Sequence, residues 1–440
     1  MKKQITLLIL IVASILNAQE KPQTYSFSLQ QAIDHALQNN YSAINAGRDI
    51  ESSKEKKWET IAAGLPQINA NVSYLNNFKI QQNQFTVNGQ TNTISFGNFN
   101  SADASLQLSQ LIFDGTYIVA LQASKTYMEF YQNAKQKTES EIKEMIVNSY
   151  GNVLLAEESI KILEKNKASL EKTLFETNET FKNGLIEEEN VEQLQITLAN
   201  INSNLNYAIR LKDIALKMLK INLGIEIENQ ITLTDKLDNL SASNLDMSLT
   251  GTPFSVQDNI DYTIMTNFVE QRSLELKLEK SKALPSLGAT VNFGSNTFGS
   301  RFTMFNATQQ WFNYSSVGVG LSIPLFSSLA RSSRTQQAKI ALEKAKTQLT
   351  ETEQKIKLQY QSAKSDYEFS IEEYATSVSN LALAERIEKK QQIKFTEGLS
   401  SSFDFNDAQR QLYTAQQSYL QSMVNIINKK AALEKIVTKN

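Results

Sequence analysis

The chain has 440 residues, of which 41% are hydrophobic and 20% are charged, and its formal net charge is −2. This near-neutral balance does not indicate the basic face that nucleic acid binding needs, so we expect no nucleic acid partner. Cysteine is absent, which excludes disulfides, thiolate metal sites and a cysteine nucleophile. The single histidine, His35, lies in the first helical run, where we expect a surface or packed residue rather than a ligand.

The N-terminus has the pattern of a secretory signal peptide. Lys2 and Lys3 precede an apolar run from Ile5 to Leu16, and the small residue Ala18 follows. We therefore expect a signal peptide over residues 1–18. No later stretch approaches ~20 apolar residues, so we expect no transmembrane helix in the mature chain.

After a helical run at 28–63, the pattern changes to alternation of apolar and polar residues. Such alternation occurs at about 67–80, 104–113, 285–294 and 312–325. A period of two indicates strands, each close to the ~9–11 residues that cross a bilayer when tilted. Alternation is typical of a transmembrane barrel, and a soluble sheet with one wet face produces it as well. The signal peptide and the missing transmembrane helix favour the barrel.

Four strands are too few for a bacterial outer-membrane barrel, whose smallest members have about eight. An open sheet edge is excluded from lipid, because each unpaired N–H or C=O group there costs several kcal/mol. Strands that span the membrane must therefore come from several chains that share one barrel. Three chains would supply about 12 strands, and two would supply about eight.

Two long helices follow the strand pairs. Only Gly151 interrupts the run from 116 to 183, and neither glycine nor proline occurs from 327 to 397. A helix of about 68 residues at ~1.5 Å per residue spans about 100 Å. Small and apolar residues recur every three or four positions from Ala338 to Tyr374, which indicates coiled-coil-like packing in a helical wall.

Three pairs of matching segments indicate an internal duplication. Leu65-Pro66 corresponds to Leu284-Pro285, LSQLIF at 108–113 to LSIPLF at 321–326, and FKNGL at 181–185 to FTEGL at 395–399. We expect a first repeat at 19–240, a connector at 241–259 and a second repeat at 260–440. Each repeat reads helix, strand, loop, strand, long helix, tip and helix, with tips near 184 and 398.

These motifs together resemble the TolC family of outer-membrane efflux and secretion channels. The resemblance rests on GLPQINANVSY (64–74), ALPSLGATVNF (283–293), LSQLIFDG (108–115) and the tip motifs at 182–195 and 396–412. It implies a homotrimer with a shared 12-stranded β-barrel, four strands per chain, continued by a long periplasmic α-helical barrel. It further implies an outer-membrane exit duct of a tripartite efflux or type I secretion system. Its partners would be a periplasmic adaptor protein and an inner-membrane transporter.

The second tip contains two candidate pore residues, Asp404 and Asp407. From the residues alone, Gly398 caps one helix and the two carboxylates favour the positive end of the next helix. The resemblance implies that these aspartates, six and nine residues after Gly398, form a ring at the channel entrance. Both interpretations stay open at this point.

The turns at the two tips are the candidate adaptor contacts, again through the resemblance. They are Gly184 with Leu185, and Gly398 with Leu399.

We expect no catalytic residues, no cofactor and no metal site. The chain has no cysteine, no glycine-rich phosphate loop and no GxSxG elbow, which argues against an enzyme. The alternative is a secreted coiled-coil structural or adhesive stalk protein without channel activity. That alternative accounts for secretion and long helices, and it does not predict duplicated strands of lipid-spanning length.

Overall fold

The computed structural model describes residues 24–251 and 253–438, so the expected signal peptide lies outside the described residues. The fold is mainly helical, and its contacts form two units. Unit 1 contains 24–48, 133–264 and 351–438, and unit 2 contains 49–132 and 265–350. No helix within the described residues is both long enough and apolar enough to cross a membrane.

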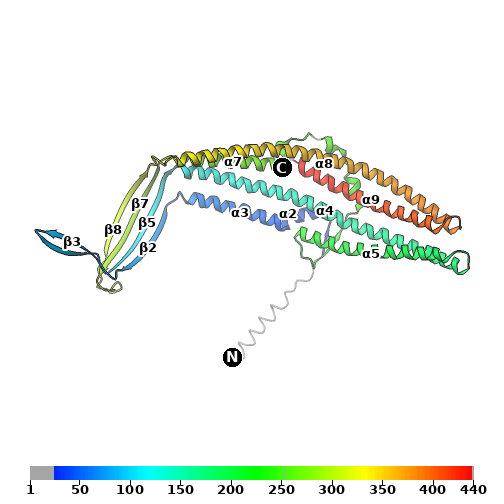
Figure 1. Ribbon diagram of the computed structural model, residues 1–440, viewed down its shortest axis with the longest axis horizontal. Helices are drawn as coiled ribbons and strands as arrows, with labels where there is room; N and C mark the ends of the chain where they lie inside the picture. Colours follow the sequence, from blue (N-terminus) through cyan, green and yellow to red (C-terminus); the bar gives the residue numbers. More distant parts are fainter. Residues whose placement is uncertain (1–23, 252, 439–440) are drawn as a thin grey trace, which may run out of the picture. The chain divides into compact units, whose positions relative to one another are not determined.

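The boundary between the units falls within four helices, labelled in Figure 1. They are α3 (Tyr41–Ala62), α4 (Gly115–Lys182), α7 (Ile260–Ser281) and α8 (Ala330–Thr396). The other elements of unit 1 are β1 (Thr24–Phe27), α2 (Leu29–Asn39), α5 (Glu188–Leu223), β6 (Gln230–Leu233), α6 (Leu237–Ser243), α9 (Ser402–Val437) and the 3-10 turns η1 (Met247–Gly251) and η2 (Val256–Asp258).

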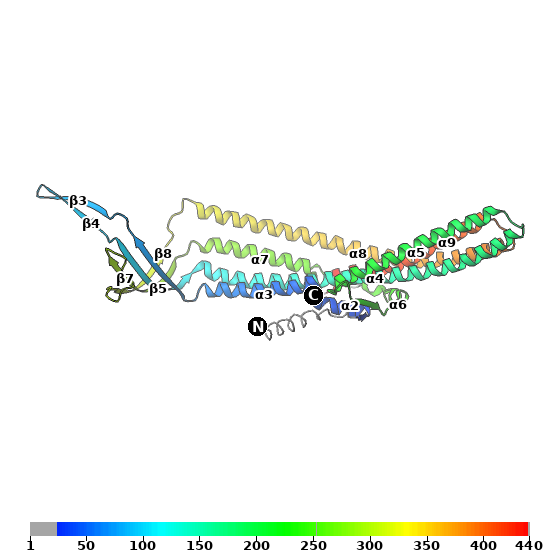
Figure 2. The same ribbon diagram turned by 90° about the horizontal axis from the view of Figure 1, so that it is seen from below.

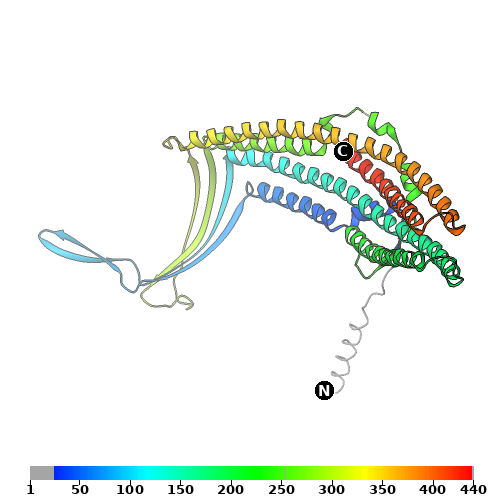
Figure 3. The ribbon, with the colours of Figure 1, turned by 45° about the vertical axis from the view of Figure 1, so that its right-hand side comes forward.

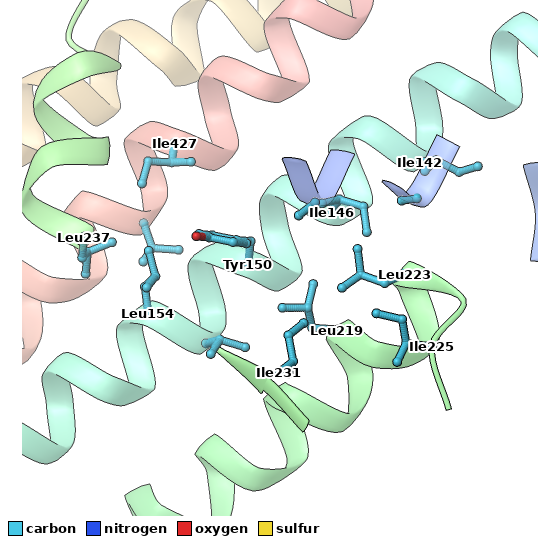
Figure 4. Close-up of a cluster of buried hydrophobic side chains, with 14 of the residues drawn as sticks. Ile142, Ile146, Tyr150, Leu154, Leu219, Leu223, Ile225, Ile231, Leu237 and Ile427 are labelled. Carbon is cyan, nitrogen blue, oxygen red and sulfur yellow. The ribbon is translucent and has the colours of Figure 1, made fainter. Parts of the chain in front are cut away.

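The main core of unit 1 surrounds Tyr150 of α4, which is fully buried among aliphatic side chains from α4, α5, β6, α6 and α9 (Figure 4). The Tyr150 hydroxyl donates to the Phe27 carbonyl at 3.0 Å and lies 3.1 Å from Asp235 Oδ2. The backbone N–H of Leu29 donates to the same Asp235 oxygen at 2.7 Å. Burial raises the pKa of Tyr150. The buried Tyr150 hydroxyl therefore has a hydrogen-bond partner in Phe27, just before α2, and a second acceptor nearby in Asp235.

Strands β1 and β6 form a short parallel pair that the sequence did not predict. Phe27 of β1 packs against His35 of α2, with ring centroids 5.0 Å apart. Partial burial lowers the pKa of His35. His35 is thus a packed residue in this structure, which is one of the two roles expected for it.

The helical run predicted at 28–63 is wrong in one respect, because Asn40 divides it into α2 and α3. Asn40 has extended backbone angles (φ −62°, ψ 136°). Its side chain donates to the Asn222 carbonyl at 2.7 Å and accepts from the Ser42 N–H at 2.8 Å. Asparagine competes well for local backbone groups, which favours a break here.

Unit 2 contains a four-stranded antiparallel sheet in the order β2-β5-β7-β8 (Figure 3). Its strands are β2 (Gln67–Asn76), β5 (Asn100–Asp114), β7 (Ser286–Gly299) and β8 (Phe312–Ser322). A separate hairpin of β3 (Gln81–Val87) and β4 (Gln90–Phe96) follows β2 (Figure 2). The strand expected at 67–80 therefore ends at Asn76, and the hairpin after it was not predicted.

The helix-to-strand junctions before β2 and β7 form the same pair of hydrogen bonds. Gly64 N and Leu65 N donate to the carbonyls of Ile61 and Ala62. Ala283 N and Leu284 N donate in the same way to Lys280 and Ser281, each 219 positions later. A proline follows each junction and stops the helix from continuing.

Candidate functional site

The four-stranded sheet of unit 2 is amphipathic across its whole width. Its register aligns Ile68, Leu108, Val291 and Val317 in one row on one face. The row one position along, on the opposite face, contains Asn69, Gln107, Asn292 and Ser316. Because successive side chains point to opposite faces of a strand, the alternation in the sequence gives the sheet one mainly apolar face and one mainly polar face.

The apolar face is exposed. The exposed fraction is 80% at Val72 and 76% at Val317, and it reaches 61% at Phe293 in the interior strand β7. A contiguous apolar surface of this kind indicates contact with a partner or with lipid rather than with water.

The polar face contains a cross-strand contact. The Tyr314 hydroxyl of β8 donates to Asp103 Oδ2 of β5 at 2.8 Å, across β7. Gly294 of β7 lies beneath the tyrosine ring, since a Cβ there would come within 2.5 Å of Tyr314 Cζ. Glycine at this position therefore lets the ring lie flat on the polar face.

Both edges of the sheet are open. Within the described residues, β2 and β8 each pair on one side only. Edge strands of 10 and 11 residues present rows of unpaired N–H and C=O groups, which readily pair with another chain.

The second candidate feature is the pair of helix tips in unit 1, where α4 turns into α5 and α8 turns into α9. Gly184 and Gly398 both have φ +71°, the left-handed conformation that favours glycine. The N–H groups of Leu185 and Leu399 donate to carbonyls five residues back, at 3.2 and 2.7 Å. Each tip is therefore a Schellman C-cap.

Both tips expose a leucine. The exposed fraction is 75% for Leu185 and 78% for Leu399, and Phe403 beside the second tip is 70% exposed. The sequence singled out the two leucines but missed Phe403.

The structure places Asp404 and Asp407 in the first turns of α9. Asp404 completes a capping box, because its Oδ2 accepts from the Ser401 backbone N–H at 3.3 Å while its own N–H donates to Ser401 Oγ at 3.1 Å. The Ser401 hydroxyl also donates to Asp404 Oδ2, at 2.7 Å. These hydrogen bonds lower the pKa of Asp404. Asp407 accepts from Arg410 and from Gln411 Nε2, both on α9. Each carboxylate therefore has a local partner, Asp404 at the N-cap and Asp407 within α9, and the ring of aspartates stays a prediction.

A small core that the sequence analysis missed positions this tip. Phe405 is fully buried and stacks on Phe395 of α8 with ring centroids 5.3 Å apart. Leu170, Leu194 and Ile201 are the other buried members of this cluster. These residues lie on four different helices, so no pattern within one stretch of sequence indicated that they would meet.

Within the described residues, no three His, Asp or Glu side chains gather closely enough to hold a metal ion.

Comparisons with known proteins agree with this geometry. Residues 269–438 match the family model of the outer membrane efflux proteins. The structure is similar to CusC, with a TM-score of 0.75 and 16% identity over 96% of both chains. It is also similar to the CmeC outer membrane channel of Campylobacter jejuni, with a TM-score of 0.71 and 18% identity over 93% of this chain and 85% of that one.

The MtrE outer membrane channel of Neisseria gonorrhoeae, in its open state, gives a TM-score of 0.72 and 16% identity over 93% of this chain and 88% of that one. No curated protein matches the sequence. The fold is that of the TolC-family channels, and the resemblance stated from the sequence is confirmed.

Proposed function

We propose that this chain, a relative of the outer membrane efflux proteins with the fold of the TolC family, is the passive outer-membrane exit duct of a tripartite efflux or type I secretion system. One observation carries the proposal. The sheet of unit 2 exposes apolar side chains from all four strands on one face, while the opposite face is mostly polar and both edges are open. A sheet of this kind suits a wall between lipid and a water-filled lumen.

The open edges of β2 and β8 lead to the proposal of a homotrimer. In the bilayer these edges must pair, and three copies with four strands each would close a barrel of about 12 strands. The helices would then form the periplasmic part of the duct. A stalk protein gives no reason for an exposed apolar sheet, so we do not favour that alternative.

The helix tips are the proposed entrance and docking region. Leu185 and Leu399 are exposed apolar side chains on rigid glycine-capped turns, which suits contact with a periplasmic adaptor that links the duct to an inner-membrane transporter. In a threefold assembly, Asp404 and Asp407 would contribute six carboxylates near one constriction. Such a ring attracts cations and lowers the passage of anions.

Ion conductance in a planar bilayer tests the proposal, with a variant that changes Asp404 and Asp407 to alanine. A matched control changes Asp34 and Asp213, which lie elsewhere in unit 1, to alanine and removes the same charge. We expect stable unit conductance in all three proteins and reduced cation selectivity in the tip variant alone.

Equal cation selectivity in the two variants would show that the tip aspartates only stabilise the start of α9 and do not line the entrance. Inserted, folded protein without any conductance would overturn the channel itself.

A further inference from the structure

The β3–β4 hairpin stands apart from the four-stranded sheet (Figures 1 and 2). Its two ends are held together where it leaves the sheet, since Asn77 N donates to the Phe99 carbonyl at 2.7 Å and Asn77 Nδ2 to the Asn98 carbonyl at 2.9 Å. Every residue of both strands is exposed. An isolated two-stranded hairpin is marginally stable in water, so this one needs a partner.

The two faces of the hairpin differ in composition. The register places all its apolar side chains on one face, and each is opposite an amide. These residues are Phe85, Val87, Ile94 and Phe96. The other face contains only hydroxyl and amide side chains, among them Thr86 and Thr91, whose hydroxyls lie 3.3 Å apart.

The hairpin has none of the usual protection against association. Residues 80–102 contain no charged residue and no proline. Charged side chains and proline are the common means by which natural edge strands avoid pairing with another chain. Both outer edges of this hairpin are unpaired within the described residues.

We propose that the hairpins of neighbouring copies of this chain pack on one another through the apolar face, and form a cap at the outer end of the assembly. The inference rests on the proposed homotrimer. The hairpin continues directly from β2, the edge strand that would meet the next copy. Three identical copies bring no charge repulsion into this contact, because the segment is uncharged. Identical apolar residues from each copy then cover one another.

The absence of native cysteine provides a direct test. Ile94→Cys and Phe85→Cys each place a thiol on the apolar face, and Thr93→Cys places one on the polar face next to Ile94. Each single variant is oxidised mildly in detergent and run on a non-reducing gel. A disulfide requires Cβ atoms about 3.5–4.5 Å apart, so only thiols that meet across copies cross-link.

We expect a band of two linked chains from at least one apolar-face variant, and no such band from Thr93→Cys. Native gels of the same samples report whether the oligomer is intact. An intact oligomer without any apolar-face cross-link, or with equal cross-linking on both faces, overturns the hairpin contact and leaves the proposed channel standing. Monomeric protein in every sample overturns the homotrimer and the hairpin contact together.

Discussion

A charge on the apolar face of the sheet should prevent insertion into lipid, whereas the same charge one residue away should not. Val317 lies at the centre of β8, in the row that also contains Val291, and is 76% exposed. Its neighbour Ser316 lies on the polar face. Arginine on a lipid-facing strand at the bilayer midplane costs about 2–4 kcal/mol, and arginine facing the lumen is tolerated. Val317→Arg and Ser316→Arg therefore form a matched pair.

The assay is refolding from urea into phospholipid vesicles, with the folded fraction followed by protease protection. A cost of about 2–4 kcal/mol corresponds to a change of about 30- to 700-fold in the insertion equilibrium of Val317→Arg. Ser316→Arg should stay within about threefold of the parent protein, because surface substitutions usually cost less than about 0.5 kcal/mol. Equal losses in the two variants, or a larger loss for Ser316→Arg, would refute the assignment of the faces.

Three further predictions concern unit 1. Gly398→Ala should destabilise the second tip by about 1–2 kcal/mol, because φ +71° disfavours a Cβ. In contrast, Gly47→Ala should stabilise the protein by about 0.5–1 kcal/mol, because Gly47 lies within α3 and a Cβ there would meet no other atom. Urea unfolding of the two variants measures both free-energy changes. Asp404→Ala should speed amide exchange in the first turn of α9 at neutral pH. Because the pKa of Asp404 is lowered in the folded state, the stability that its carboxylate gives to this turn is present above pH 3.8 and is lost as the pH falls through the folded-state pKa. The same difference in exchange rate between the variant and the parent protein at every pH would contradict this. Tyr150→Phe should lower the free energy of unfolding by about 1–3 kcal/mol, because the Phe27 carbonyl and the Asp235 carboxylate lose the buried hydroxyl donor that they share. A cost no larger than that of Tyr127→Phe, at an exposed position, would show that this hydrogen bond contributes little.

Strong local signals made much of the fold predictable from the sequence. Alternation marked the strands of the main sheet, which lie at 67–76, 100–114, 286–299 and 312–322. Gly184 and Gly398 ended long helices because only glycine adopts positive φ there without strain. The bounds of the repeats and of the connector stay predictions.

Features that depend on distant contacts were missed. Strands β1 and β6 are four residues each and pair in parallel across about half the chain, so no local pattern marks them. The break at Asn40 depends on a carbonyl of Asn222 that only the folded core brings near.

The β3–β4 hairpin was missed although it had a local signal, because Asn88 and Gly89, both with positive φ, form the Asn-Gly turn of a tight hairpin.

The candidate site was predictable to a similar degree. The tip positions of Asp404 and Asp407 followed from their spacing to Gly398, and the structure adds their hydrogen-bond partners Ser401 and Arg410. The packing of Phe405 beneath them required four helices to converge, which no single stretch of sequence encodes.

The number of chains in one membrane-inserted particle tests the central claim most directly. Native mass spectrometry of the protein released from lipid nanodiscs measures it without labels. The proposed shared barrel predicts a particle of three chains, because four strands with open edges cannot close alone. A folded, lipid-inserted particle with the mass of one chain would contradict the account.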